Sequence, residues 1–274
     1  MKKHAVTIIL VLVMLVGISL LLYPSVADYW NERHASRAIA TYVEAVADIN
    51  DETYTRMWQE AEEYNARLAK TGIRWKMDTE QMETYQQLLN IDGSGIMGYV
   101  EIPQIDVMLP IYHGTEEAVL QIAIGHIAYT SLPVGGAGTH CVISGHSGLA
   151  SARLFTSLDE LHEGNLFMIH TLDEILTYEI DQIRTVLPFE LNELQIVEGQ
   201  DLCTLVTCTP YGINTHRLLV RGHRVETKQS SEVRVTGDAT IYDPLTVAPL
   251  VAAPVLLFLF ILLLVKGHRK KKQT

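Results

Sequence analysis

Residues 204–217 carry the side chains that point most directly to chemistry. The apolar, β-branched run 202–207 predicts a buried strand, and Pro210-Tyr211-Gly212 predicts the turn that ends it. Cys208 is therefore expected at a strand end, where a thiol can meet a substrate. Arg217 opens a second apolar run, so a nucleophilic sulfur and a permanent cation are expected at the same rim of a sheet.

An imidazole completes this set. Residues 142–144 predict a short strand that runs into His146, which is flanked by Gly145 and Gly148. A protonated imidazole and a guanidinium near a thiol favour the thiolate, which is the attacking form. The three side chains together predict nucleophilic catalysis through a thioester. Arg217 would hold the substrate carbonyl or its oxyanion, and His146 would transfer the proton.

Other residues compete for these roles. A lone Cys at a strand end is more often a small core residue, and Arg221 lies on the same strand face as Arg217. The histidines that compete with His146 are His113, His126, His140, His170 and His216. A structural zinc site would need closely spaced Cys and His ligands, and the sequence has no such pattern. We therefore expect no metal.

These motifs resemble the sortases, the membrane-bound cysteine transpeptidases of Gram-positive bacteria. The strand Thr-Leu-Val-Thr-Cys at 204–208 is similar to the nucleophile motif of that family, and His146 and Arg217 fall where its other two catalytic residues would. The resemblance runs from about Gly93 to Arg224 and includes the segments 98–103, 110–115 and 130–136. Residues 208–222, together with a hydrophobic C-terminal segment, are most similar to the class C, pilin-polymerising branch.

The resemblance implies a reaction and its partners. A sorting signal similar to Leu-Pro-x-Thr-Gly, in a secreted protein, would be cleaved between Thr and Gly, and the acyl group would pass from Cys208 to an amine, expected to be a pilin lysine. Thr207, Thr209 and Tyr211 would be neighbours of the substrate, and no cofactor is implied. Three alternatives stay open: a cell-wall-anchoring sortase that uses a peptidoglycan-precursor amine, a hydrolase, and an inactive scaffold that binds pilins.

Both ends of the chain have the composition of membrane spans. Residues 5–23 and 245–265 are almost unbroken apolar stretches, each long enough to cross a bilayer. Lys2 and Lys3 precede the first stretch, and four lysines with Arg269 follow the second, so both ends are expected in the cytoplasm and the part between them outside the cell. The sequence thus predicts a two-pass protein of the cell membrane. A cleaved signal peptide remains the alternative for the first stretch.

The charge of the chain is strongly acidic outside these ends. The 274 residues contain 21 Lys and Arg against 32 Asp and Glu, and seven of the 21 lie in the terminal tails, which carry no acid. The part between the tails therefore has 14 basic and 32 acidic residues. Such a surface disfavours nucleic acid and anionic lipid as partners and suits a cationic one, although solubility explains much of the charge.

The pattern between the two spans predicts a mainly β fold. Residues 28–69 have apolar side chains at helical spacing, interrupted near Asn50-Asp51, which favours one or two helices that brace the barrel rather than recruit a partner. Predicted strands follow at 98–102, 107–111, 140–144, 165–170, 175–186, 201–207 and 216–220, with short helices at 116–123 and 154–161. Strand runs with few helices predict a closed or nearly closed β-barrel, in agreement with the sortase fold.

The expected fold is a closed eight-stranded, sortase-type β-barrel with N-terminal helices, flanked by two transmembrane helices. Its expected parts are a cytoplasmic tail (1–4), a span (5–23), a helical stalk and brace (24–70), a lid-like linker (71–95), the barrel (96–226), a linker (227–244), a second span (245–265) and a basic cytoplasmic tail (266–274).

Two features depart from a simple catalytic barrel. Cys141 and Cys203 would face each other if strands 140–144 and 201–207 run in parallel, within reach of a disulfide, although two reduced core cysteines are the preferred prediction. Class C sortases commonly carry an Asp-Pro-aromatic lid, which residues 71–78 lack. Trp75 and Asp78 are the lid candidates, and a remade plug on a helical turn at 74–78 is less favoured than a weak or absent lid.

Overall fold

The computed structural model describes residues 2–73, 75–149, 151–227 and 254. The chain divides into two compact units, one of residues 1–30 and 230–274 and the other of residues 31–229. The described part of the first unit belongs to helix α1 (Lys2–Asp48). An 18-residue window of this helix has a mean hydropathy of 2.5 and no buried residue, so the helix is long and apolar enough to cross a membrane. A signal sequence would meet the same criterion. The predicted second span and the basic tail lie outside the described residues, apart from residue 254.

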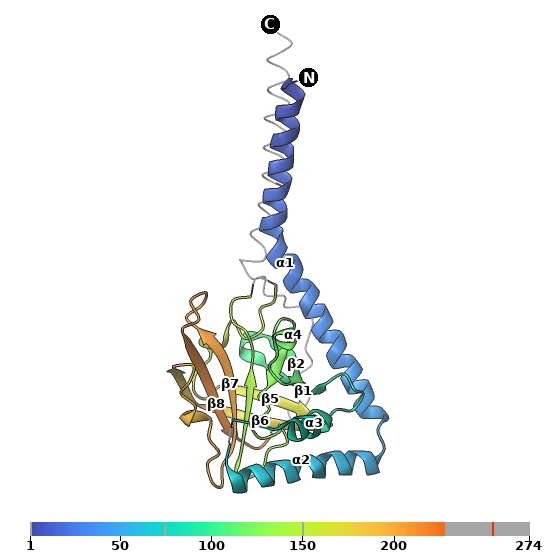
Figure 1. Ribbon diagram of the computed structural model, residues 1–274, viewed down its shortest axis with the longest axis vertical. Coiled ribbons are helices and arrows are strands. Elements are labelled where there is room, and N and C mark those ends of the chain that lie inside the picture. The colour runs from blue at the N-terminus through green and yellow to red at the C-terminus, as the bar shows by residue number, and fades with distance from the viewer. Residues whose placement is uncertain (1, 74, 150, 228–253, 255–274) are drawn as a thin grey trace. The chain divides into compact units, whose positions relative to one another are not determined.

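The predicted helices are present, and the predicted break between them is confirmed. Helix α1 ends at Asp48, and α2 (Asp51–Thr71) begins after Asn50, whose side chain accepts a hydrogen bond from the Thr53 amide at 2.8 Å. The second helix braces the barrel (Figure 1): the Tyr64 hydroxyl donates to the Ala128 carbonyl, and the Asn65 amide exchanges two hydrogen bonds with the backbone of Leu132.

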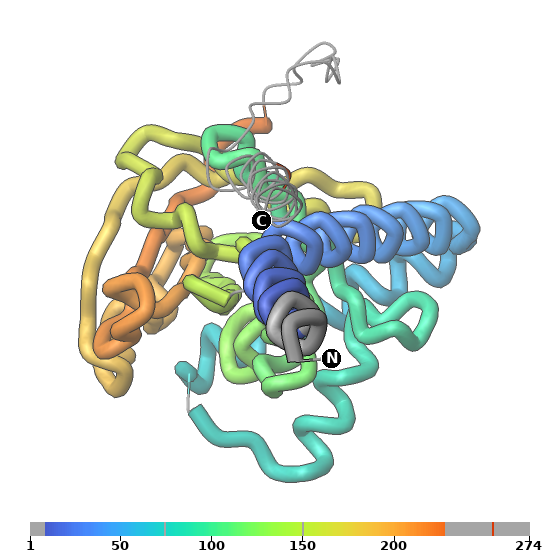
Figure 2. The backbone as a smooth tube through the Cα atoms, turned by 90° about the horizontal axis from the view of Figure 1, so that it is seen from above, coloured from blue at the N-terminus to red at the C-terminus, as the bar shows by residue number. Residues whose placement is uncertain are grey.

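Eight strands close into a barrel in the order β1-β2-β3-β4-β7-β8-β6-β5. Their bounds are β1 Ile96–Ile102, β2 Val107–His113, β3 Ile124–His126, β4 Thr139–Ser144, β5 Leu166–Thr171, β6 Glu174–Val186, β7 Asp201–Thr209 and β8 His216–Arg224. The short helices are α3 Thr79–Gln87, α4 Glu117–Leu120 and the single 3-10 turns η1 Pro103–Ile105, η2 Leu158–Glu160 and η3 Asn192–Leu194. In Figure 2 the orange tube of β7 and β8 lies beside the yellow tube of β6.

The seven predicted strands are found, each with somewhat different ends, and three short elements differ from prediction. Strand β3 was not predicted because three residues are too few to show an alternating pattern. The helix predicted at 154–161 is wrong in extent, since only Leu158–Glu160 form a 3-10 turn. Helix α3 lies in the segment predicted as a linker, where Asp78 and Gln81 form a capping box and Tyr85 is completely buried.

The register of three neighbouring strands creates two different faces. Strand β4 runs parallel to β7, with Cys141 opposite Cys203, and β7 pairs antiparallel with β8. Alternate residues therefore point into the barrel or away from it. The inward residues of β4 and β7, such as Ile143 and Leu205, belong to the main core. Val142 and Val206 belong to a second, smaller apolar cluster on the outer face.

Candidate active site

The outer face of β7 and β8 is built in rows. Cys208 lies opposite Arg217, and Val206 lies opposite Leu219. A third pair, Thr204 and Arg221, continues the ladder away from the cysteine. Side chains two residues apart share a face of a strand, so a reactive pair, an apolar pair and a polar pair follow one another along the same surface.

Cys208 carries a free thiol that is partly exposed. The sequence predicted that the strand ends at residue 207, but β7 continues through Thr209, so Cys208 lies within the ladder and pairs with Arg217. Pairing across the ladder brings Cβ atoms to about 5 Å in an antiparallel sheet. The strand register therefore places the Cys208 thiol next to the aliphatic part of the Arg217 side chain.

The two candidate arginines have different surroundings. The Arg217 guanidinium donates to the carbonyls of Asn214 and His216, at 3.3 and 3.0 Å, and within the described ranges no carboxylate lies at salt-bridge distance from it. Arg221 instead forms a two-point pair with the Asp181 carboxylate, at 2.9 and 3.0 Å. Only Arg217 of these two lies opposite Cys208, and its remaining donors are available to a substrate oxygen.

His146 lies just beyond the end of β4, in line with Cys208. The parallel pairing of Ser144 with Val206 continues as a hydrogen bond from the Gly145 amide to the Val206 carbonyl, at 3.0 Å. If the same parallel register is extended by two residues on each strand, His146 lies beside Cys208. The Nε2 atom of His146 is buried and has no hydrogen-bond partner among the described residues. The hydrogen-bonding capacity of this atom is therefore not used by the described part of the protein.

The backbone on both sides of His146 is fixed. The Thr207 hydroxyl, which is buried, donates to the Gly145 carbonyl at 2.8 Å, and the Phe155 amide donates to the His146 carbonyl at 3.1 Å. A Cβ at Gly145 would lie 2.7 Å from an Ile124 methyl and 2.8 Å from the Phe155 ring, closer than a side chain can approach. Glycine at 145 is therefore required by packing.

The three predicted substrate-site neighbours occupy different positions. Thr207 points inward to the His146 segment, whereas Thr209 pairs with His216 at the end of the β7–β8 ladder. Tyr211 is 67% exposed, and its ring lies about 3.1 Å from where a Cβ of Gly148 would stand. Because Gly148 has a φ of +79° and no side chain, the tyrosine ring can lie directly on the loop that carries His146.

The structure adds a region that sequence reasoning missed. The loop between β6 and β7, residues 187–200, packs Leu191 and Leu194 against Val206 and Leu219 on the outer face. These loop residues form a wall beside the strand that carries Cys208. Apolar residues recur through this loop between polar ones, and such a pattern does not reveal which surface Leu191 and Leu194 cover.

The two lid candidates separate in the structure. Trp75 packs against the same outer apolar cluster, and its ring lies 6.4 Å from that of Tyr129. Asp78 caps helix α3 by accepting a hydrogen bond from the Gln81 amide at 2.8 Å. Trp75 has a φ of 49° and residues 76–78 are irregular, so no helical turn joins Trp75 to Asp78. The aromatic residue lies on the outer apolar cluster, whereas the acid is committed to a helix cap.

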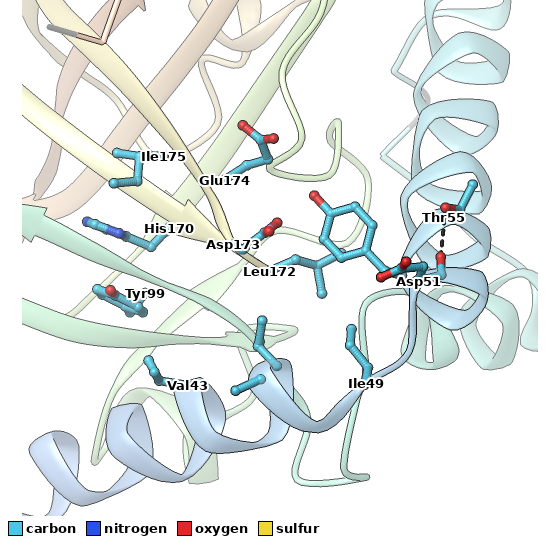
Figure 3. A pocket seen from close by; sticks show the side chains of 13 residues that line it. Val43, Ile49, Asp51, Thr55, Tyr99, His170, Leu172, Asp173, Glu174 and Ile175 are labelled. Carbon is cyan, nitrogen blue, oxygen red and sulfur yellow. Dashed lines mark hydrogen bonds between the residues drawn. The ribbon is translucent and has the colours of Figure 1, made fainter. Parts of the chain in front are cut away.

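A cavity of about 730 Å³ lies elsewhere on the barrel (Figure 3). Its walls include Tyr99 and His170, whose rings stack 4.2 Å apart, and the carboxylates of Asp173 and Glu174. Glu174 begins β6, whereas Val186 at the other end of β6 pairs with Arg217. The cavity is therefore remote from Cys208, and its lining contains none of the predicted site residues.

The other two cysteines are buried and reduced. Cys141 and Cys203 face each other across the parallel β4–β7 pair, and both thiols are free. The preferred prediction of two reduced core cysteines is confirmed. Burial raises the pKa of the Cys203 thiol well above its ordinary value, so this sulfur stays protonated and unreactive. Among the described residues no cluster of three or more His, Cys, Asp or Glu could hold a metal ion.

Comparison with known proteins identifies relatives over most of the catalytic unit. The family model described as the sortase domain matches residues 100–225. The structure of sortase C1 from Streptococcus agalactiae is 50% identical, covers 70% of this chain and all of its own, and superposes with a TM-score of 0.69. Sortase C from Clostridium perfringens, solved with the C-terminal cell wall sorting motif, is 41% identical, with a TM-score of 0.62 and coverage of 70% and 100%.

Three further relatives extend this comparison. A crystal structure of Streptococcus pneumoniae sortase C, reported with insights into pilin substrate specificity, is 40% identical, with a TM-score of 0.62 and coverage of 69% of this chain and 97% of its own. Sortase A from S. agalactiae is 27% identical over 139 residues, which is 50% of this chain. The match spans 56% of the length of that curated relative and 64% of the next, sortase A from Bacillus anthracis.

Proposed function

We propose a specific reaction for this chain, which belongs to the sortase family of cysteine transpeptidases. The substrate is a secreted protein with a sorting signal resembling Leu-Pro-x-Thr-Gly, which is cleaved between Thr and Gly. The acyl group passes through a thioester on Cys208 to an amine, and the acceptor is a pilin lysine. The observation that carries this proposal is the direct opposition of Cys208 and Arg217, with His146 at the end of the adjoining strand.

Cys208, Arg217 and His146 each have a separate role in the first half-reaction. The Cys208 thiolate attacks the carbonyl carbon of the Thr–Gly bond, and the carbonyl oxygen gains negative charge. Arg217 donates to that oxygen through directed N–H groups. The C–N bond then breaks, and the departing glycine amine takes a proton from His146 Nε2. A thioester on Cys208 and a free glycine amine are the products of this step.

The second half-reaction runs through the same groups in reverse. The acceptor amine attacks the thioester carbon and gives a proton to His146. The C–S bond breaks as a new amide forms, and Cys208 leaves as the thiolate. Splitting one difficult acyl transfer into two easier steps is the general advantage of a covalent intermediate. Amide formation prevails over hydrolysis when the amine reaches the thioester before water does.

The similar structures and the composition of the chain support the proposed acceptor amine and the proposed cellular location. Class C sortases are among the similar structures, and one of them was solved with a sorting motif, which supports a sorting signal as donor and a pilin as acceptor. The acidic excess between the tails suits a lysine-bearing partner. The apolar N-terminal helix supports membrane anchoring, and we propose two spans with the catalytic unit outside the cell.

One product analysis separates the alternatives. The full chain in detergent is incubated with a sorting peptide alone, with a lysine-bearing pilin, and with a cell-wall-precursor amine, and the products are identified by mass spectrometry. A new amide bond to the pilin lysine is expected. A product only with the wall precursor would assign cell-wall anchoring, cleavage to free acid in every mixture would assign a hydrolase, and bound but uncleaved pilin would assign a scaffold.

A further inference from the structure

The cavity between α1, α2 and the β5–β6 hairpin takes no part in the proposed reaction. Its volume of about 730 Å³ lies within the range of ligand pockets, roughly 300–1,000 Å³. Figure 3 shows Tyr99 and His170 on one side of the cavity and Asp51 on the other, with Asp173 between them. All its lining residues belong to the unit of residues 31–229, so the cavity is a feature of the catalytic unit itself.

Two hydrogen bonds to one tyrosine hold the walls of this cavity together. The Tyr42 hydroxyl of α1 donates to the Met97 carbonyl at 3.2 Å and accepts from the Leu172 amide at 2.7 Å. Leu172 has a φ of 53°, a left-handed conformation that is uncommon for leucine, and its side chain is buried. Leu172 and Asp173 form the turn of the hairpin, so these contacts fix the place of Asp173 on the cavity wall.

Much of the lining is apolar or aromatic. Val43 and Val46 of α1 contribute aliphatic surface, and the lining also contains the Tyr54 ring. The rings of Tyr99 and His170 stack at 4.2 Å with 7° between their planes. Carbon surface of this kind packs well against the methylene stem of a long charged side chain.

The charged residues of the lining are all acidic. They are Asp51, Asp173 and Glu174, and the lining contains no Lys or Arg. Among the described residues, none of these three carboxylates has a Lys or Arg at salt-bridge distance. Burial, together with Asp173 and Glu174, raises the pKa of Tyr54, so its hydroxyl stays neutral. A negative wall of this composition favours a positively charged ligand.

Two basic residues near this wall have other contacts. The Nε2 atom of His170 lies 3.0 Å from a carboxylate outside the lining. Arg224 lines a neighbouring, smaller cavity, where its guanidinium lies over the Tyr178 ring at 5.8 Å from the centroid. That second cavity shares Glu174 with the large one but does not include Asp173. The charge of Asp173 is therefore directed to the large cavity alone.

We propose that this cavity is an exosite for a basic segment of the acceptor pilin, held through a lysine or arginine side chain. The inference rests on the proposed function for its partner. The cationic group of the pilin lies near Asp173 and Glu174, and its methylene stem packs on the apolar lining. Because the cavity is remote from Cys208, the basic residue held here differs from the lysine that attacks the thioester. A folded pilin contacts both sites, and the second contact raises its overall affinity.

The first experiment measures binding without chemistry, in the full chain in detergent with Cys208→Ala. The probe is a peptide of alternating lysine and glycine with a neutral fluorophore, and its anisotropy is followed on titration with the protein. The matched probe carries Nε-acetyl-lysine at the same positions. The acetylated probe is expected to bind at least about fivefold more weakly, because it has lost the cationic groups. Equal binding of the two probes would overturn the proposal.

A pair of double variants then locates the binding site. Asp173→Asn with Glu174→Gln removes two charges from the cavity, and Glu60→Gln with Glu63→Gln removes two from an exposed part of α2 outside its lining. The cavity variant is expected to raise Kd for the lysine probe about tenfold, and the control variant less than twofold. All four side chains are exposed, so unchanged melting temperatures are expected in both. Equal weakening in both variants would show general attraction to an acidic surface and would overturn the proposal.

The second experiment identifies the partner. Amide-bond transfer from a sorting peptide to a lysine-bearing pilin is measured at varied pilin concentration with the active full chain. The cavity variant is expected to raise KM for the pilin about tenfold, and the control variant less than twofold. An unchanged KM in the cavity variant would overturn the pilin as the partner. Probe binding that depends on Asp173, with no amide bond to pilin formed by the unmodified chain, would reject the proposed function and not the cation site.

Discussion

Cys203 and Cys208 lie on the same strand but on opposite faces of it. Cys203 points into the barrel, is completely buried, and has a pKa raised by burial. Cys208 points outward, is partly exposed, and lies opposite Arg217. Five residues separate them, so a period of two places one sulfur in the core and the other at the rim. The same side chain is buried on one face, and on the other it is the nucleophile of the proposed reaction.

The inner and outer faces of β4 and β7 also differ in the effects expected from substitutions. The inner face of β4 and β7 belongs to one large apolar core, where volume is the main constraint. The outer face carries three rows of different chemistry: Cys208 and Arg217 are the proposed reactive pair, Val206 and Leu219 are apolar, and Thr204 and Arg221 form a polar pair. Variants on the outer face are therefore expected to separate catalysis, binding and stability, whereas inner-face variants are expected to change stability alone, except at Thr207, whose hydroxyl supports the segment that carries His146.

The largest effect is expected at the reactive row. Arg217→Lys keeps the charge but loses the planar fork of donors, so we expect kcat for peptide cleavage to fall by about 10²–10³. The matched control is Arg221→Lys, which alters the pair with Asp181 and is expected to keep kcat within about threefold because a partly exposed ion pair is worth roughly 1 kcal/mol or less. An equal loss of kcat in both variants would contradict the different roles assigned to Arg217 and Arg221.

The next effect concerns the pH dependence of stability at His140, a buried residue of β4 whose Nε2 atom lies 2.7 Å from the Thr204 hydroxyl of the polar pair. Burial lowers the pKa of His140 from 6.5 to about 4, so between these values the unfolded chain binds more protons than the folded one. Stability from this residue is complete above pH 6.5 and falls as the pH drops toward 4, by about 3 kcal/mol in total.

The measurement is chemical unfolding at several pH values. His113 is partly buried, has a lowered pKa and adds to the slope in the same direction, so the comparison is between the unmodified chain and His140→Asn. The variant is expected to lose distinctly less stability between pH 6.5 and 4. The same pH slope in both proteins would show that His140 is not held neutral by the fold.

A smaller effect is expected from Thr207, which points inward yet supports the outer site. Thr207→Val removes the donor to the Gly145 carbonyl and leaves a buried acceptor unpaired, which costs roughly 1–3 kcal/mol. Thr207→Ser keeps the hydroxyl and is the control. We expect the Val variant to lose stability and kcat together, since Gly145 precedes His146. Full kcat in Thr207→Val would show that this bond does not hold His146 in place.

The smallest effect concerns the lid candidates. Trp75 packs on the apolar cluster around Val206 and Leu219, whereas Cys208 itself is partly exposed, so we propose that Trp75 covers this cluster and leaves the thiol open. Trp75→Ala, alone or with Asp78→Ala, is expected to change Cys208 labelling by iodoacetamide less than about twofold, because labelling follows thiol exposure. A large acceleration would show that this segment covers the cysteine.

Much of the fold and the geometry around Cys208 followed from local patterns. Short apolar runs between turn residues predicted seven strands, and helical spacing with a break near Asn50 predicted one or two helices, because each signal lies within a few residues. Strand β3 and helix α3 depend on distant partners, such as the His126 ring that contacts Tyr85, and no local pattern reports such contacts. The packing of Leu191 on the outer face was missed for the same reason, because it depends on which strands become neighbours.

The most direct test of the account is the intact mass of the protein after incubation with a sorting peptide. An acyl adduct on Cys208 is expected, absent in Cys208→Ala and retained in Cys141→Ala and Cys203→Ala. Proteolytic mapping then assigns the adduct to one residue. An adduct on Cys203 or Cys141, or acylation that persists in Cys208→Ala, would contradict the claim that the outer face of β7 carries the nucleophile.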